Sequence, residues 1–574
     1  MRKFSVTILF LLVVNLLFTQ VAVGKNIVSL RSGIPFEEQV RNPHTTYIIT
    51  NDFELYGKKV VLPEQCDLLF KAGSKLSNGV LVLNETEIES RGVCFDQIVL
   101  LGTAASDVYA KWFSNKTTSV LYSLFRVSNN KIVLEKQKKY ILNVGGIDVF
   151  EKDSLSIIGN NSTIIVNREK AYLNFNHCNY LHLSDLVLDG CNITAKGIAL
   201  YSCDNSSLDN VTIRNIGNKG MTIHTYALNV NDCKGLVIDN CLIQDVEANS
   251  SEIAAGIVIQ PYLSFCENII IRNTTVRRIW SRSSADGLGA DCIKIAGQYD
   301  NFNEVNVTID KCNLYDFTKR AVKVQASNVT ISNCQIGQTA FMDDKIVPTY
   351  AISTFGSNTI VKRNTIMMKK GRFGVSVYSY PSGHINIINE QIVIDERYKN
   401  KGVEIKDNTI EIEDAYMGVC VGGTNKTDIQ EYNDITITGN KIACYTGTYG
   451  IRFLYGRVDG CTVERNKLNG FAYGIYSEAY NIPFVQEGNE YLYAANKKHV
   501  VLLRNTIKGD GGGSKCAFYI GQLELSEIKK NTISDYDMPI LIEENRMFQS
   551  LGNAIMGNKM RRCNSGIVDR RLEK

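Results

Sequence analysis

Two short segments of the chain carry ionisable side chains at matching positions. "DCIKI" begins at Asp291 and "RAVKV" begins at Arg320, and each has a lysine three residues on, Lys294 and Lys323. If the segments are neighbouring strands, the two ammonium groups repel by about 1–3 kcal/mol at a partly wet surface. A protein keeps such a pair where an anion or a nearby acid compensates. β-Elimination needs one cationic side chain that neutralises the carboxylate of a uronate, and a second basic side chain that removes the adjacent proton. We therefore predict these four residues as catalytic.

Residues in the flanking segments complete the predicted site. Aromatic rings and a few polar groups are the usual lining of a site that binds a small ligand. The histidine of this set ends the segment "GMTI", which we interpret as a strand on the same face. A salt-bridged, solvated strand face, with Asp291 paired to a lysine, is the alternative interpretation. The predicted substrate-binding residues are Asp286, Trp280, Tyr299, Tyr262 and His224.

The sequence gives little indication of a cofactor. The six histidines lack zinc-like spacing apart from His177 and His182, which have no further ligand near them. Asp343 and Asp344, or the acids of "DYDMP", could bind calcium through paired carboxylates, but we interpret them as solvated loop acids. No phosphate loop, nucleotide fingerprint or serine elbow occurs. We expect no cofactor, with calcium as the weaker alternative.

A repeat must position the predicted site. "LVIDNCLI", "VTIDKCNL", "EIKDNTI" and "ITITGNKI" each combine a short alternating strand, a corner and a second strand. A third strand of the type "GIVI" follows after a variable gap. Units of roughly 20 to 40 residues without a helix cannot bury their own apolar face, so they must stack. Isoleucine and valine dominate, which disfavours a leucine-rich repeat. The corner residues are Cys191, Ile216, Cys241, Thr274, Cys312, Cys334, Asn364, Asn408, Asn440, Asn466, Asn505, Asn531 and Asn558.

This pattern predicts an all-β chain that folds as a single-stranded right-handed parallel β-helix, a solenoid with N-terminal capping coils and a short helix. In each "GIVI"-type strand the residue between the apolar ones faces outward. Equivalent positions on neighbouring coils lie about 4.8 Å apart, which places Lys294 beside Lys323. The predicted outward row is Thr222, Val258, Lys294, Lys323, Ser353, Ser376, Cys420, Arg452 and Tyr476.

The chain divides into four predicted segments. Residues 1–24 have the basic start, the apolar run and the small residues before Gly24 that are typical of a cleaved signal peptide. Residues 25–130 form lead-in coils, in which "TSVLYSLFRV" from Thr118 is the best helix candidate. The β-helix takes 131–560 and a tail takes 561–574. We expect a bacterial protein that is secreted, periplasmic or on the cell surface, without a membrane span in the mature chain.

Composition limits the partners and the state of the cysteines. The 63 Lys+Arg against 59 Asp+Glu give a net charge of +4, which does not indicate a nucleic-acid binder. Sixteen cysteines are too dilute for a disulfide scaffold. Three pairs fall at equivalent places on consecutive coils, and we expect them to be buried thiols rather than disulfides. The pairs are Cys178 with Cys203, Cys233 with Cys266, and Cys312 with Cys334.

Together with "VYAKWFSNKTTSVLYSLF", the repeats resemble the pectin-lyase-like β-helix superfamily. The signal peptide combined with this architecture also resembles secreted proteins of gut Bacteroidota. Trp112-Phe113 matches a Trp-Phe-Gly segment of many members, with Ser114 in place of the glycine. The resemblance implies a fold shared by pectate lyases, polygalacturonases and phage tailspikes, and it implies a polysaccharide as partner. Fold alone does not fix the chemistry.

Three functions remain open. The first is a polysaccharide lyase acting on an anionic, uronic-acid-containing glycan. The second is a non-catalytic glycan-binding, adhesive or structural surface protein. The third is a polygalacturonase-like hydrolase, because "ADGLGADCIKI" resembles the segment of polygalacturonases in which aspartates flank a glycine and a strand. Only Asp291, not an aspartate pair, precedes Cys292, and no Gly-His-Gly occurs. We favour the lyase.

Overall fold

The structure is a computed structural model in which residues 25–570 are described, with gaps. The chain forms two compact units, Met1–Glu135 and Lys136–Lys574. The predicted signal peptide lies outside the described residues, as do Thr222, Asp286, Tyr299, Asp343 and Asp344. No helix in the described part is long and apolar enough to cross a membrane. The gaps are 128–129, 144, 218–222, 250–251, 282–288, 298–303, 340–347, 380–384, 389–390, 424–428, 478–480, 487–488 and 544–551.

The first unit contains parallel lead-in strands and the predicted helix. Helix α3 spans Thr118–Val127, as the sequence predicted, and packs on the strand of Phe95–Ala104. Its Leu121, Leu124 and Phe125 are buried and share one apolar face, because they are spaced three and four residues apart. The elements are β1 (Asn26–Ser29), α2 (Phe36–Gln39), β2 (Thr45–Ile49), β3 (Phe53–Glu54), β4 (Lys59–Val61), β5 (Asp67–Phe70), β6 (Leu76–Glu89), β7 (Phe95–Ala104), β8 (Val108–Tyr109), η1 (Ala110–Trp112), α3 and β9 (Lys131–Val133).

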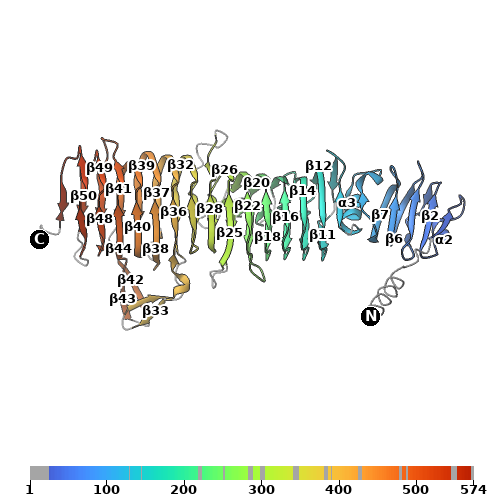
Figure 1. Cartoon of the computed structure of the whole chain (residues 1–574), viewed down its shortest axis with the longest axis horizontal. Coiled ribbons are helices and arrows are strands. Elements are labelled where there is room, and N and C mark those ends of the chain that lie inside the picture. Colours follow the sequence, from blue (N-terminus) through green and yellow to red (C-terminus); the bar gives the residue numbers. More distant parts are fainter. Residues whose placement is uncertain are drawn as a thin grey trace, which may run out of the picture. The chain divides into compact units, whose positions relative to one another are not determined.

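The second unit is a stack of coils in which each coil adds a strand to three parallel ladders (Figure 1). The first ladder carries the predicted site. Apolar residues such as Ile293 and Val322 face the interior and are fully buried. The ladder consists of β11 (Ile147–Phe150), β13 (Leu173–Asn176), β15 (Lys196–Tyr201), β18 (Thr225–Asn231), β21 (Ala254–Gln260), β24 (Ala290–Ile295), β27 (Arg320–Val324), β30 (Tyr350–Thr354), β32 (Thr365–Val377), β37 (Thr409–Val421), β39 (Lys441–Phe453), β41 (Lys467–Ser477), β46 (Cys516–Ile520), β50 (Met538–Ile542) and β53 (Ile567–Asp569).

The second ladder is built from the strands that precede the corner. Its members are parallel from coil to coil, and short strands β35 (Asn400–Lys401) and β47 (Leu523–Glu524) pair at its margin. The ladder consists of β12 (Ser156–Val166), β14 (His182–Asp189), β16 (Ser207–Asp209), β19 (Val237–Asp239), β22 (Ile270–Arg272), β25 (Glu304–Asp310), β28 (Ser327–Ser332), β31 (Ile360–Lys362), β36 (Glu404–Lys406), β38 (Glu431–Thr438), β40 (Arg457–Glu464), β44 (Lys497–Leu503), β48 (Glu527–Lys529) and β51 (Ala554–Met556).

The third ladder follows the corner, and several long strands continue from one ladder into the next. Strands β12 and β14 also belong to the second ladder, whereas β32, β37, β39 and β41 also belong to the first. The other members are β10 (Lys139–Leu142), β17 (Thr212–Gly217), β20 (Leu242–Ala248), β23 (Thr275–Ser281), β26 (Asn313–Phe317), β29 (Gln335–Gly337), β45 (Thr506–Lys508), β49 (Thr532–Ser534) and β52 (Lys559–Arg561). The predicted parallel β-helix is confirmed, and pairing of β53 with β50 continues it into the predicted tail.

Buried asparagines connect successive coils at the corner between the second and third ladders. The Asn440 Oδ1 accepts hydrogen bonds from the backbone N and the Nδ2 of Asn408, both at 2.9 Å. The same bonding recurs at every coil from Asn364 to Asn558. Each asparagine thereby satisfies buried backbone groups that the bend removes from the strand ladders. We name this series the asparagine ladder.

The two first corner residues of the predicted series are wrong. Leu186 and Val211 align with Cys241 at the bend, whereas Cys191 is exposed in a turn after β14. The chain bends earlier because Asp185 has φ 51°, so the corner lies within β14 rather than after it. A left-handed residue comes directly before every aligned corner residue, for example Asn210 before Val211.

The cysteines are free, and the three predicted pairs lie within stacked columns of buried thiols. The first two pairs join in one column, because the Cys203 backbone N donates to the Sγ of Cys233 at 3.3 Å. The hydrogen bond with Cys203, together with burial, raises the pKa of Cys178. Burial likewise raises the pKa of Cys241 to about 12. These thiols therefore behave as small core residues.

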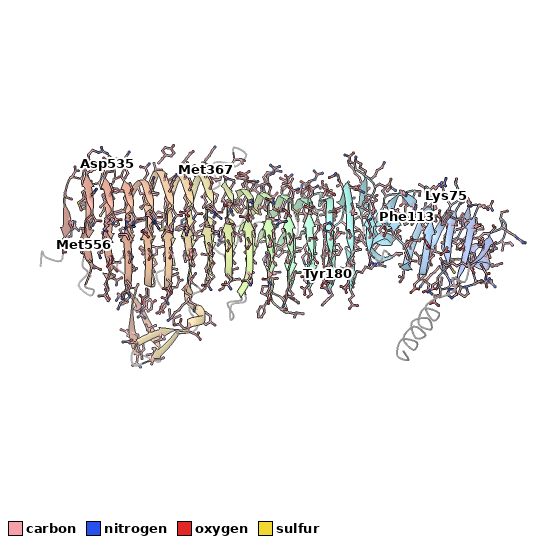
Figure 2. All side chains as sticks on the ribbon, viewed as in Figure 1. Lys75, Phe113, Tyr180, Met367, Asp535 and Met556 are labelled. Atoms are coloured by element: carbon pink, nitrogen blue, oxygen red, sulfur yellow. The ribbon has the colours of Figure 1, made fainter. Side chains whose placement is uncertain are left out.

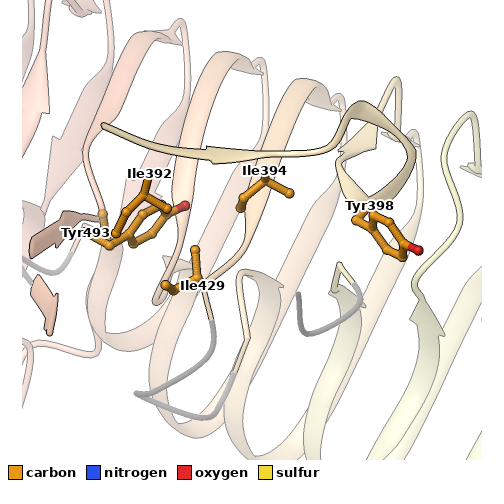
Figure 3. Packing of buried hydrophobic residues seen from close by; sticks show 6 residues of the cluster. Ile392, Ile394, Tyr398, Ile429 and Tyr493 are labelled. Atoms are coloured by element: carbon orange, nitrogen blue, oxygen red, sulfur yellow. The ribbon is translucent and has the colours of Figure 1, made fainter. Parts of the chain in front are cut away.

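Two antiparallel hairpins project from the coils of the second unit (Figure 1). One consists of β33 (Ile385–Ile388) and β34 (Gln391–Ile394), followed by η2 (Glu396–Tyr398), and the other of β42 (Asn481–Gln486) and β43 (Asn489–Ala494). They pack together through a small core separate from the coil interior (Figure 3). That core contains Ile392, Ile394, Tyr398, Ile429, Tyr493 and Ala495. Elsewhere, exposed side chains such as Tyr180 and Met367 lie on the outside of the coils (Figure 2).

Candidate functional site

The predicted register of the two lysines is confirmed. In the pairing of β24 with β27, Asp291 lies opposite Arg320 and Lys294 lies opposite Lys323. The backbones of paired residues on adjacent strands are about 4.8 Å apart. Both lysines are partly buried and alternate with the interior residues Ile293, Ile295 and Val322. Four ionisable groups thus lie on two adjacent coils, and we name them the lysine cluster.

A buried ion pair flanks the lysines. The Nη1 of Arg320 lies 3.2 Å from the Oδ1 of Asp291, and their side chains are 8% and 4% exposed. The guanidinium of Arg320 also lies over the ring of Tyr350, 5.2 Å from its centroid. The Nε of Arg320 is buried and has no hydrogen-bond partner among the described residues. This nitrogen is therefore an unsatisfied buried donor, which costs free energy.

The environment of the cluster shifts one lysine toward its neutral form. Burial is the largest cause that lowers the pKa of Lys323 to about 8, and the Arg320 charge acts in the same direction while the Asp291 carboxylate opposes the shift. Burial also lowers the pKa of Lys294, and here too Asp291 acts in the opposite direction. A lysine with a pKa of about 8 can serve as a general base near neutral pH.

The row that contains the lysines changes character along the stack. Ser353 follows Lys323 on the next coil, is fully buried, and its Oγ has no hydrogen-bond partner in the part of the chain described. Further along, Arg452 lies 4.2 Å from the ring centroid of Tyr449 and donates a hydrogen bond to the hydroxyl of Tyr416 at 2.9 Å. The outer face therefore passes from charged groups to aromatic groups.

On the other side of the cluster, apolar residues pair with two of its members: Val258 with Lys294, and Ala255 with Asp291. Tyr226, Ala255 and Val258 pack together on the coils before β24. Burial raises the pKa of Tyr226 to about 12, and the carboxylates of Asp291 and Glu252 add to the shift. Tyr226 thus contributes a neutral hydroxyl to the edge of the cluster.

His224 does not occupy the predicted position. The strand of this coil is Thr225–Asn231, so His224 precedes it, and Asn229 rather than Thr222 is the residue paired with Val258. The Nδ1 of His224 lies 2.8 Å from the Oε2 of Glu252, on a strand margin two coils before Lys294. The segments "GMTI" and "ALNV" have the same alternation, so the sequence pattern could not distinguish them.

The two described aromatic residues of the predicted site, Trp280 and Tyr262, lie on different parts of the coil. Trp280 belongs to β23 of the third ladder rather than to a loop, and it pairs with Glu247. Tyr262 is 68% exposed just beyond the end of β21, where its backbone N donates to Asp232 Oδ1 at 2.6 Å. It lies four residues beyond Val258, the partner of Lys294, and so at the far end of that strand. Asp286 and Tyr299 fall outside the described residues.

Of the candidate calcium ligands, Asp343 and Asp344 lie outside the described residues, and the acids of "DYDMP" have protein partners. Asp535 forms an ion pair with Arg562, and Asp537 Oδ1 accepts a hydrogen bond from Asn564 at 2.7 Å. No group of three or more His, Cys, Asp or Glu side chains suited to a metal ion occurs within the described ranges.

Comparison with known proteins gives structural likenesses alone. No family model matches the chain, and no curated protein matches it. The surface adhesin PfbA of Streptococcus pneumoniae is 12% identical with a TM-score of 0.39, covering 64% of this chain and 91% of its own. The A-module of the Azotobacter vinelandii mannuronan C-5 epimerase AlgE4 is 14% identical with a TM-score of 0.37, covering 61% and 91%.

A tailspike protein mutant of E. coli bacteriophage HK620, in complex with a pentasaccharide, is 12% identical with a TM-score of 0.42, covering 75% of this chain and 72% of its own. At these identities the likeness concerns the fold. The architecture of this chain is established by its own three continuous parallel ladders. The fold of the second unit is therefore a parallel β-helix.

Proposed function

We propose that this chain is a secreted, carbohydrate-active β-helix protein whose lysine cluster cleaves an anionic, uronic-acid-containing polysaccharide by β-elimination. The observation that carries the proposal is the pairing of Lys323, whose pKa is lowered to about 8, with a second lysine on the adjacent strand. Neutral Lys323 removes the proton at C5 of the uronate. Lys294, in its ammonium form, screens the carboxylate and so makes that proton acidic.

The electron pair of the C5–H bond forms the C4–C5 double bond as the C4–O bond breaks. The departing oxygen takes a proton from solvent water. Arg320 is held by Asp291 at 3.2 Å and keeps the pKa of Lys323 low. The carboxylate of Asp291 also offsets part of the repulsion among the three positive groups. These two residues thus tune and position the lysines.

A non-catalytic glycan-binding surface is the second candidate. It is favoured by the Asp291–Arg320 pair, which already balances two of the four charges. A buried pair of this kind also occurs in purely structural ladders.

The deciding experiment measures the absorbance of the unsaturated product when the purified chain is incubated with uronic-acid polysaccharides. Lys323→Met should abolish the signal, while Lys406→Met, at an exposed position of β36, should retain it. Absence of product with all uronic-acid polymers, or equal activity of Lys323→Met, would refute the lyase proposal.

A further inference from the structure

The two projecting hairpins create a cavity that the lysine cluster does not involve. It has a volume of about 510 Å³ and lies between β34, β43 and the outer faces of β38, β40 and β44. This volume is within the range of pockets that hold small ligands, about 300–1,000 Å³. Unlike most such pockets, its wall is polar. The polar residues used below are Lys399, Glu431, Arg457, Asp459, Asn496 and Lys498.

A single arginine fixes both hairpins to the coil. The Nη1 of Arg457 donates to the carbonyl of Ile392 in β34, and its Nε donates to the carbonyl of Ala494 in β43, both at 3.1 Å. Its guanidinium lies 4.2 Å from the ring centroid of Tyr493, in the hairpin core of Figure 3. The cavity is therefore built from three chain segments held by one side chain.

The charges of the wall are balanced internally. Glu431 Oε2 lies 3.0 Å from the Nζ of Lys399, and its Oε1 lies 3.3 Å from Arg457. The Nζ of Lys498 lies 3.2 Å from the Oε2 of Glu524. Each lining cation thus has a carboxylate partner, so the cavity offers hydrogen-bonding atoms without an unpaired positive charge.

One acceptor of the wall lacks a donor. The Nδ2 of Asn496 donates to Glu524 at 2.8 Å, but its Oδ1 is buried and has no hydrogen-bond partner among the described residues. Asp459, more exposed, receives a hydrogen bond from His499 at 2.6 Å. An uncharged ligand rich in hydroxyl groups would satisfy such a wall, because hydroxyls both donate and accept.

We propose that this cavity binds a neutral saccharide unit, as a second glycan site separate from the lysine cluster. The inference depends on the glycan part of the proposed function and does not depend on catalysis. It gives the two inserted hairpins a common role, because neither one alone encloses the cavity.

The test uses the full chain and neutral cello-, malto-, xylo- and manno-oligosaccharides of two to four units, with oligogalacturonides of equal length for comparison. Binding is measured by ligand-observed NMR and calorimetry. We expect at least one neutral series to bind, and Asn496→Leu or Asp459→Leu to weaken that binding at least tenfold. Lys323→Met and the surface control Lys406→Met should bind as the unsubstituted chain does.

The outcomes separate the two proposals. If no neutral series binds, or if both cavity variants bind normally, the cavity proposal is wrong whatever the lyase assay gives. The cavity proposal is also wrong if Lys323→Met loses binding of the neutral oligosaccharides while the cavity variants keep it. If the cavity variants weaken binding of the neutral oligosaccharides and no uronic-acid polymer is cleaved, only the lyase proposal fails. Circular dichroism of Asp459→Leu, a substitution at an exposed strand position, controls for misfolding.

Discussion

Replacing one central member of the asparagine ladder should destabilise the second unit strongly. The Oδ1 of Asn440 accepts two hydrogen bonds from Asn408, and its Nδ2 donates to the Ile405 carbonyl at 2.8 Å and to the Asn466 Oδ1 at 2.9 Å. Asn440 is fully buried, so water cannot replace these partners. Asn440→Ala leaves two donors and one carbonyl unsatisfied, at about 1–3 kcal/mol each. Partial relaxation reduces the sum to about 3–5 kcal/mol.

The matched control is Asn558→Ala, at the C-terminal end of the same ladder. Asn558 accepts from the N and Nδ2 of Asn531, both at 3.0 Å, and donates to Ile528 at 2.8 Å. It is partly exposed, so water can replace some of these bonds, and the expected loss is about 1–2 kcal/mol.

Urea denaturation followed by circular dichroism measures both variants, and hydrogen exchange locates the affected coils. Protection should fall around Ile405 and Asn466 in the first variant and only near the end in the second. Because contacts in a solenoid are between neighbouring coils, the effect should be local. Equal losses for the two variants, or a loss below about 1 kcal/mol for Asn440→Ala, would refute the argument that burial makes these bonds irreplaceable.

The other predictions concern Lys323, Arg457 and the thiols. Lyase rates should rise as the pH increases through about 8, because Lys323 must lose its proton to act as the base; a flat profile from about pH 6 to 9 contradicts this. Because the pKa of Lys323 is lower in the folded chain than in the unfolded chain, burying its charge reduces the free energy of unfolding. This reduction is complete below about pH 8 and disappears above the unfolded pKa of about 10.5. Lys323→Met should therefore raise the unfolding free energy by about 1–3 kcal/mol at pH 7 and leave it unchanged near pH 11, as denaturant titrations at both pH values would show. Arg457→Ala should speed hydrogen exchange in β34 and β43 without changing the strand ladders, and unchanged exchange would show that the hairpin core alone holds them. In denaturant without reductant, close to all 16 cysteines should react with a thiol reagent, and a markedly lower count would mean that some columns are bridged.

The fold could be predicted because the repeat is visible in single side chains. From Asn364 to Asn558 the corner residue is the same type at every coil, so the register follows directly. The prediction of the corner failed before Cys241, because the corner residues there, Leu186 and Val211, resemble the apolar residues of the neighbouring strands. A better signal was present there in the left-handed residue that precedes each corner, an Asp or Asn in both coils.

The candidate site could be predicted in register but not in environment. The strand alternation placed Lys294 beside Lys323, yet the lowered pKa of Lys323 comes from burial, which depends on segments distant in sequence. An exposed lysine could be replaced with little effect on stability, whereas Lys323 is partly buried. The hairpin cavity was missed because β34 and β43 each resemble an ordinary short strand. Nothing in either segment indicates that the two meet.

The strand pairing around these hairpins has a consequence for how such a chain can change. Strand β41 ends at Ser477 and β44 begins at Lys497, yet β44 still pairs in register with β40 and β48. Because lengthening a surface loop costs little free energy, about 0.6 kcal/mol for each doubling, an insertion at this point leaves the supporting coils intact. New recognition surfaces can therefore arise by local duplication or grafting, one gap at a time. The same positions would accept foreign hairpins in a designed protein.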